Sequence, residues 1–179
     1  MNGRRGEYPA HLARERHLAD GRAVLIRPVR AEDESRELEF LSQLSAETRQ
    51  LRFMKYVGAI SDRLVHFFTH IDYDRHMAFV CDAKGAPGGD LVGEARYLGN
   101  PDGRSCEFGI VIADDWHGSG IAGLLMDALM RAAQARGFET MEGIVMRENR
   151  DMLHFVKALG FEVELIPEDP KTVRVLKKL

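Results

Sequence analysis

The sequence contains only two cysteines, Cys81 and Cys106, and each lies inside an apolar run that is typical of a strand. Two isolated thiols in such runs do not support a disulfide framework or a zinc knuckle. We therefore expect both thiols to be buried and chemically inert.

The sequence also lacks any apolar run long enough to span a bilayer, and residues 1–20 lack the apolar segment of a secretory signal. Its 25 basic and 28 acidic side chains are mixed along the chain. Such a balance gives no basic surface for nucleic acid or for an anionic membrane. We expect a cytoplasmic protein that binds neither.

At 179 residues, 45% of them apolar, the chain has the length of one domain and can bury a core. No internal repeat or low-complexity segment is present. We expect residues 1–20 to form a mobile or packed extension, with a docking arm for an acidic partner as the alternative, and residues 21–179 to form one domain.

The expected elements follow from apolar periodicity and turn residues. Strands are expected at 21–29, 76–83, 90–98, 105–113, 139–146, 161–166 and 172–179, and helices at 31–45, 61–71, 119–137 and 149–160. The three central strands would form an antiparallel meander, with residues 82–90 as a hairpin loop. This order predicts the α/β (α+β) class: a mixed, mostly antiparallel sheet flanked by helices.

The run Gly118-Ser119-Gly120-Ile121-Ala122-Gly123 fits the dinucleotide-binding pattern G-x-G-x-x-G, and Glu142 follows at a suitable distance. However, residues 114–117 separate the strand from the first glycine, and too few βαβ units follow for a doubly wound sheet. A P-loop is excluded because no Lys-Ser/Thr pair follows the turn. What remains is a row of backbone N–H groups at a helix N-terminus, suited to a phosphate, or a tight turn that allows close helix packing.

The segment His117–Ala122 and the later Glu148-Asn149 and Leu159-Gly160-Phe161 resemble the motifs of the GNAT superfamily of acyl-CoA-dependent N-acetyltransferases. More narrowly, the segments "YPAHL", "DGRAVLIRPVRAEDE", "LSAETRQLRF" and "DYDRHMAFV" resemble the acetyltransferase domain of bacterial protein lysine acetyltransferases.

The resemblance implies that acetyl-CoA is the co-substrate. Its pyrophosphate would lie on the amides of Gly118, Ser119, Gly120, Ile121, Ala122 and Gly123, and its pantetheine arm would pair with the backbone of Ile110 and Ile112. Asn149 matches a position that contacts the arm, but it could equally be a helix N-cap. His117 stands where the family usually has Arg or Gln, so part of the charge that faces the phosphate is lost above neutral pH.

Amine acylation needs a proton acceptor, because a lysine amine with a pKa of about 10.4 is mostly protonated at pH 7. The resemblance implies Glu107 as the general base, and its apolar strand suggests desolvation that raises its pKa. The structural alternative is that Glu107 lies at the solvent-exposed beginning of its strand and pairs with Arg96 across the sheet. Glu94 is a reserve candidate, or else an exposed sheet residue. Val156 stands where many members have a tyrosine acid, so we name no general acid.

His66 and His70 are spaced i and i+4, with Asp72 and Asp74 close behind, which could suggest a metal site. Phe67 stands where the H-E-x-x-H motif has its glutamate. We therefore expect a solvated helix face and no metal.

The leading hypothesis is transfer of an acetyl group from acetyl-CoA to a primary amine by direct attack, with a protein lysine as the acceptor. A small-molecule amine such as a polyamine is the alternative acceptor, and a non-catalytic acyl-CoA-sensing module is the alternative function. The oligomeric state is left open.

Overall fold

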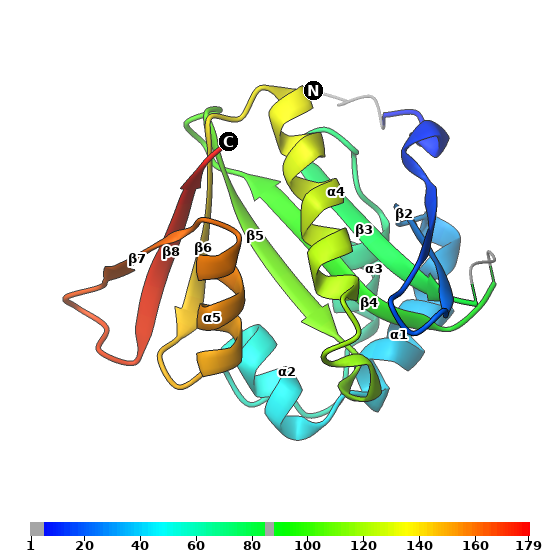
Figure 1. Cartoon of the computed structure of the whole chain (residues 1–179), viewed down its shortest axis with the longest axis horizontal. Helices are drawn as coiled ribbons and strands as arrows, with labels where there is room; N and C mark the ends of the chain where they lie inside the picture. Colours follow the sequence, from blue (N-terminus) through cyan, green and yellow to red (C-terminus); the bar gives the residue numbers. More distant parts are fainter. Residues whose placement is uncertain (1–5, 85–87) are drawn as a thin grey trace.

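The computed structural model describes residues 6–84 and 88–179. In these ranges the chain forms one sheet with helices on both faces (Figure 1). Its strands are β1 (Arg14–His17), β2 (Ala23–Pro28), β3 (His76–Ala83), β4 (Leu91–Gly99), β5 (Ser105–Ile112), β6 (Thr140–Met146), β7 (Glu162–Leu165) and β8 (Thr172–Lys178). Its α-helices are α1 (Glu34–Gln43), α2 (Ala46–Phe53), α3 (Asp62–Thr69), α4 (Ile121–Arg136) and α5 (Arg150–Ala158), and short 3-10 turns lie at Ala10–Leu12, Ala31–Asp33 and Asp114–Trp116.

The strand order is β1-β2-β3-β4-β5-β6-β8-β7. Every neighbouring pair is antiparallel except β5 and β6, which run parallel. The predicted fold class and the central meander are therefore confirmed. The hairpin between β3 and β4 is also confirmed, although residues 85–87 of its loop lie outside the described part of the chain.

The sheet separates two apolar cores, because successive side chains of a strand point to opposite faces. In Figure 1, α4 and α5 lie in front of the sheet and α1 and α3 lie behind it. The larger core packs beneath α4 and includes Phe108, Leu125 and Val156. The smaller core includes Phe40 of α1 and Phe68 of α3.

Two elements were not predicted from the sequence. Helix α2 has no buried residue, and all four residues of β1 are exposed. Among the eight residues of α2 only Leu51 and Phe53 are large and apolar, and β1 has no apolar residue, so neither segment carries an apolar pattern long enough to predict it. The strand β1 pairs with β2 and forms one edge of the sheet, so part of the expected extension 1–20 belongs to the sheet.

Both cysteines are buried, and burial raises the pKa of each thiol to about 12. The expectation of buried, unreactive thiols is therefore confirmed. Among the described residues, no helix combines the length and the apolar character needed to cross a membrane.

Candidate active site

The parallel pairing of β5 with β6 is short. It covers only Ser105–Glu107, whereas on their other sides β5 stays paired with β4 as far as Ile112 and β6 stays paired with β8 as far as Met146. Figure 1 shows the two strands diverging, with α2 and α5 beside the opening. The ring of Phe108 fills the point of separation, where a Cβ added to Gly143 would lie 2.7 Å from it. In the described part of the chain, the side of β5 that faces away from β4 therefore has no strand beside it from Phe108 to Ile112. We call this side the open edge of β5.

The hydrogen-bond alternation of β5 decides which backbone groups face this opening. Asn100 N–H donates to Ser105 O at 2.9 Å, and Ala113 N–H donates to Val92 O at 2.9 Å. In an antiparallel pair such bonds recur at every second residue, so the odd-numbered residues of β5 bond to β4. The backbone groups of Ile110 and Ile112 consequently face the opening, as the pairing expected with a pantetheine arm requires.

The imidazole of His117 occupies part of that edge. Its Nε2 lies 3.0 Å from the carbonyl oxygen of Ile112. A neutral ring that donates from Nε2 has only an acceptor left at Nδ1, so it can donate to a phosphate only when protonated.

The glycines after β5 form a turn that is open to the outside. Gly118 and Gly120 have φ angles of 74° and 94°, in the left-handed region that favours glycine. A Cβ added at Gly118, Gly120 or Gly123 would meet no described atom within 4 Å. Close helix packing therefore does not require these glycines, and that alternative is wrong.

The turn leads into the N-terminus of α4, which no side chain caps. The amide of Ile121 has only a long contact of 3.4 Å with Ser119 Oγ. Those of Ala122 and Gly123 have no acceptor among the described residues. These free donors coincide with the positive end of the helix dipole, so the turn can hold an anionic group such as a phosphate.

Glu107 lies on β5 where β5 and β6 are still paired. Its neighbours Cys106 and Phe108 point into the core beneath α4, so Glu107 points to the opposite face. It is exposed and has no hydrogen-bond or ion-pair partner among the described residues. The expected desolvation of Glu107 is therefore wrong, because the face that carries its carboxylate is open to solvent at this point.

Arg96 does not pair with Glu107, because its register partner on β5 is Gly109. Arg96 instead forms a two-point ion pair with Glu94. Glu94 is completely buried, so it is not an exposed sheet residue. Burial alone would raise the pKa of Glu94, but Arg96 and then Arg52 outweigh burial and lower it. A carboxylate held in this way is a poor general base.

Two further charged residues lie beside this pair and were not predicted: Glu37, which is fully buried, and Arg52, whose side chain is 16% exposed. The guanidinium of Arg52 lies against β5, so that a Cβ added to Gly109 would be 2.7 Å from its Nη2 atom. Burial lowers the pKa of Arg52. Burial and the charge of Glu94 raise the pKa of Glu37 well above its usual value. Only folding brings these residues together, since Arg52 is on the unpredicted helix α2.

A hollow of about 420 Å³ lies between α2 and the start of α5. It is lined by Glu47, Gln50, Leu51, Glu148, Asn149, Arg150 and Asp151. Asn149 caps α5 by accepting the amide of Met152 at 3.2 Å, so the N-cap alternative is confirmed. Its side-chain NH₂ group makes no hydrogen bond with described residues, so it can still serve a ligand in the hollow.

Val156 is fully buried on α5 and belongs to the core beneath α4. The position that often carries a tyrosine is therefore a packing position in this chain, and it contributes no acid.

The histidines of α3 do not meet Asp72 and Asp74. Asp72 accepts the amides of Asp74 and His76, and Asp74 pairs with Arg136. His66 and His70 instead face Glu34 of α1, which the sequence did not indicate.

Comparison with known proteins agrees with this geometry. The family model described as Acetyltransferase (GNAT) family matches residues 40–161. An acetyltransferase of Pseudomonas aeruginosa is 39% identical over 158 residues, which cover 87% of this chain and 84% of that protein.

Solved structures share the fold. The GNAT domain of PAT from S. lividans superimposes with a TM-score of 0.87 at 25% identity, covering 97% of this chain and all of that one. The spermidine N-acetyltransferase of Vibrio cholerae, solved with CoA and spermine, has a TM-score of 0.66 at 20% identity, over 87% of this chain and 95% of that one. The chain therefore belongs to the acetyltransferase (GNAT) family and is an acyl-CoA-dependent N-acetyltransferase.

Proposed function

We propose that this enzyme acetylates lysine side chains of proteins, and that the opening between β5 and β6 is its active site. The observation that carries the proposal is the continuity of the unpaired edge of β5 with the free amides at the start of α4. One surface thus offers strand-like pairing to an extended arm and an anion site to a phosphate.

The residues present fit acetyl-CoA. The backbone of Ile110 and Ile112 would hold the pantetheine arm, and the amides of Gly118, Ser119, Gly120, Ile121, Ala122 and Gly123 would hold the pyrophosphate. His117 would add a charged donor when protonated, and the free amide NH₂ of Asn149 would contact the arm. The supporting observations are the amides of Ala122 and Gly123, which have no acceptor among the described residues, and the open space above the glycines. The amide of Ser119 donates to Trp116 O at 3.2 Å and would have to exchange that bond for one to the phosphate.

Acetyl transfer forms a bond between the amine nitrogen and the acetyl carbon and breaks the carbon–sulfur bond. Glu107 would accept the proton that the amine must lose, directly or through one water. Its carboxylate is exposed and has no partner among the described residues, so an incoming amine or a bridging water can reach it. The chain offers no acid at Val156, so the thiolate would leave unassisted or take its proton from water.

The lysine acceptor is supported by the resemblance of several segments to bacterial protein lysine acetyltransferases. It is also supported by the hollow between α2 and α5, whose three acidic residues, Glu47, Glu148 and Asp151, outnumber its one basic residue, Arg150, and would favour a cationic side chain. The same acidic lining favours a polyamine as the second candidate, and one of the structural neighbours is a spermidine N-acetyltransferase.

Radiolabelled acetyl-CoA distinguishes these candidates. The enzyme is incubated with a dialysed cell extract and, separately, with the small-molecule fraction removed from it. Label in protein, recovered as Nε-acetyllysine and absent with Glu107→Gln, is the expected result. Label confined to the small-molecule fraction would instead establish the second candidate.

A further inference from the structure

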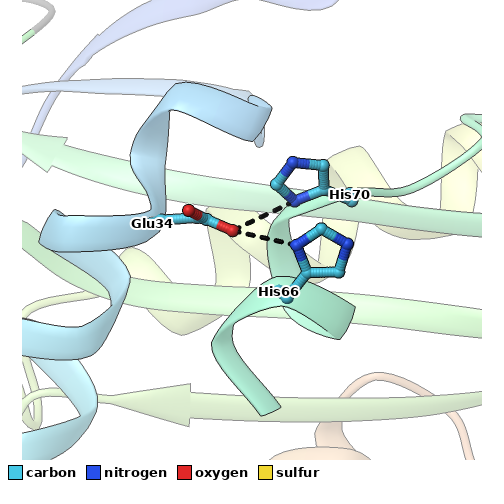
Figure 2. A group of neighbouring side chains, drawn as sticks. All are labelled: Glu34, His66 and His70. Carbon is cyan, nitrogen blue, oxygen red and sulfur yellow. Dashed lines mark hydrogen bonds and ion pairs between the residues drawn. The ribbon is translucent and has the colours of Figure 1, made fainter. Parts of the chain in front are cut away.

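Glu34, His66 and His70 form a compact group of side chains from two helices (Figure 2). Glu34 begins α1, His66 lies in the last turn of α3, and His70 follows that helix as its C-cap. The Nδ1 atom of His66 is 3.0 Å from Glu34 Oε1, and that of His70 is 3.4 Å from the same oxygen. All three ligand atoms lie within 4.8 Å of one another.

The two imidazoles are arranged by the helix. Residues spaced i and i+4 lie on the same helix face, and the rings of His66 and His70 stack with centroids 3.8 Å apart. Both Nδ1 atoms therefore point in one direction, and Figure 2 shows both directed at the carboxylate of Glu34. The three side chains converge on one point.

The spacing matches a metal site. In a tetrahedral zinc site with bonds of 2.0–2.1 Å, neighbouring ligand atoms are about 3.3 Å apart. The two separations from Glu34 Oε1, 3.0 Å and 3.4 Å, lie on either side of that value. Small shifts of the exposed side chains of Glu34 and His66 towards the partly buried His70 would thus suffice to place all three atoms around one ion.

We propose that Glu34, His66 and His70 bind a divalent transition-metal ion, for which Zn²⁺ is the best match. Two imidazole nitrogens and one carboxylate oxygen suit Zn²⁺ and its neighbours in the first transition row, whereas Mg²⁺ and Ca²⁺ prefer oxygen ligands. The exposed fractions of His66 and Glu34, 61% and 48%, leave room for a water as a fourth ligand.

The group makes a different set of contacts without a metal. His70 Nδ1 also lies 3.1 Å from Thr69 Oγ1, which donates to Val65 O and can accept from the ring. Metal binding would exchange this bond and the bonds to Glu34 for metal bonds. It would also tie α1 to α3, the two helices that cover the second core, and should therefore stabilise the fold.

The test is a Zn²⁺ titration of the whole chain, purified without a polyhistidine tag and treated with a chelator that is then removed. We expect one Zn²⁺ per chain and a rise in Tm of at least about 2 °C at saturation. Co²⁺ in place of Zn²⁺ should give the intense visible absorption of a tetrahedral site.

Variants on the two helices locate the ion. Glu34→Gln and His70→Gln should each weaken Zn²⁺ binding at least about tenfold and remove the Tm shift. His17→Gln, which changes an exposed histidine on β1, should leave both unchanged. Absence of saturable binding, or binding that survives both cluster variants, would overturn the proposal.

Discussion

Glu107 differs from the buried glutamates around it in having no partner among the described residues. Glu94 is neutralised by Arg96, and the raised pKa of Glu37 favours its uncharged form. Of the three, only Glu107 is exposed and free of a partner among the described residues, which leaves it open to an incoming amine as a general base must be.

Replacement of Glu107 by Gln should lower kcat by about a hundredfold or more. The binding of acetyl-CoA and the Tm should change little, because the carboxylate makes no contact that the fold depends on. Steady-state kinetics and a binding titration measure the two effects separately. Glu162→Gln, an exposed glutamate on the edge strand β7, is the matched control and should keep full activity. Equal kcat in both variants would remove Glu107 from the mechanism.

His76 offers a pH test at the scale of one residue. Burial, and then the charge of Arg96, lower the pKa of His76 to about 4. Its Nε2 atom lies 2.8 Å from Arg96 Nη1 and accepts from it. In the unfolded chain His76 binds a proton below about pH 6.5, while in the fold it stays neutral. Its contribution to stability is therefore complete above pH 6.5 and is lost as the pH falls towards 4.

Between pH 7 and pH 5 this loss should reach about 2 kcal/mol. Glu37 acts in the opposite direction, because its raised pKa makes the fold less stable as the pH rises above about 4.5. Comparison of His76→Gln with the parent protein cancels that effect. Urea unfolding at both pH values should show a smaller loss on acidification in the variant, and parallel losses would contradict the assigned pKa.

At the scale of elements, the sequence predicted best where a segment buries one face. The bounds of β3 and the ends of α4 and α5 agree closely with expectation because apolar periodicity and closing glycines mark them. The helix α2 and the strand β1 have no fully buried residue, and with only two large apolar residues in α2 and none in β1 their sequences mark no buried face. The Ser45 cap was the one local signal for α2, since its hydroxyl accepts the amide of Thr48.

The first turn of α4 allows a test that separates stability from cofactor binding. Gly123 has ordinary helical geometry, so Gly123→Ala should stabilise the fold by up to about 1 kcal/mol. Gly120 has a φ of 94°, so Gly120→Ala should destabilise it by about 1 kcal/mol. Both new methyl groups would enter the space above the turn, and each should weaken acetyl-CoA binding about tenfold, or about 1.4 kcal/mol.

Thermal unfolding and a binding titration measure these two effects. We expect a higher Tm for Gly123→Ala, a lower Tm for Gly120→Ala, and a similar loss of acetyl-CoA affinity in both variants, because the ligand would lie above the turn. Unchanged affinity in both variants would place the phosphate elsewhere.

For the molecule as a whole, the sequence predicted most helices and strands but not all the contacts between them. The glycine turn and the strand before it are adjacent in the chain, so the cofactor residues could be proposed together. Arg52 meets Gly109, and Glu34 meets His66, only after helices from a distant part of the chain have packed on the sheet. Burial also depends on such packing. For this reason Glu107 was expected to be desolvated but is exposed, and Glu94 was expected to be exposed if it is not catalytic but is buried.

We propose that acetyl-CoA lies along the open edge of β5 and on the amides at the start of α4. Hydrogen–deuterium exchange of the protein with and without CoA tests it most directly. We predict slower exchange at Phe108–Ile112 and at Gly118–Gly123, with little change in β1 and β7, which lie at the two edges of the sheet. Protection confined to other segments, or no protection at saturating CoA, would show that the cofactor does not bind along this edge.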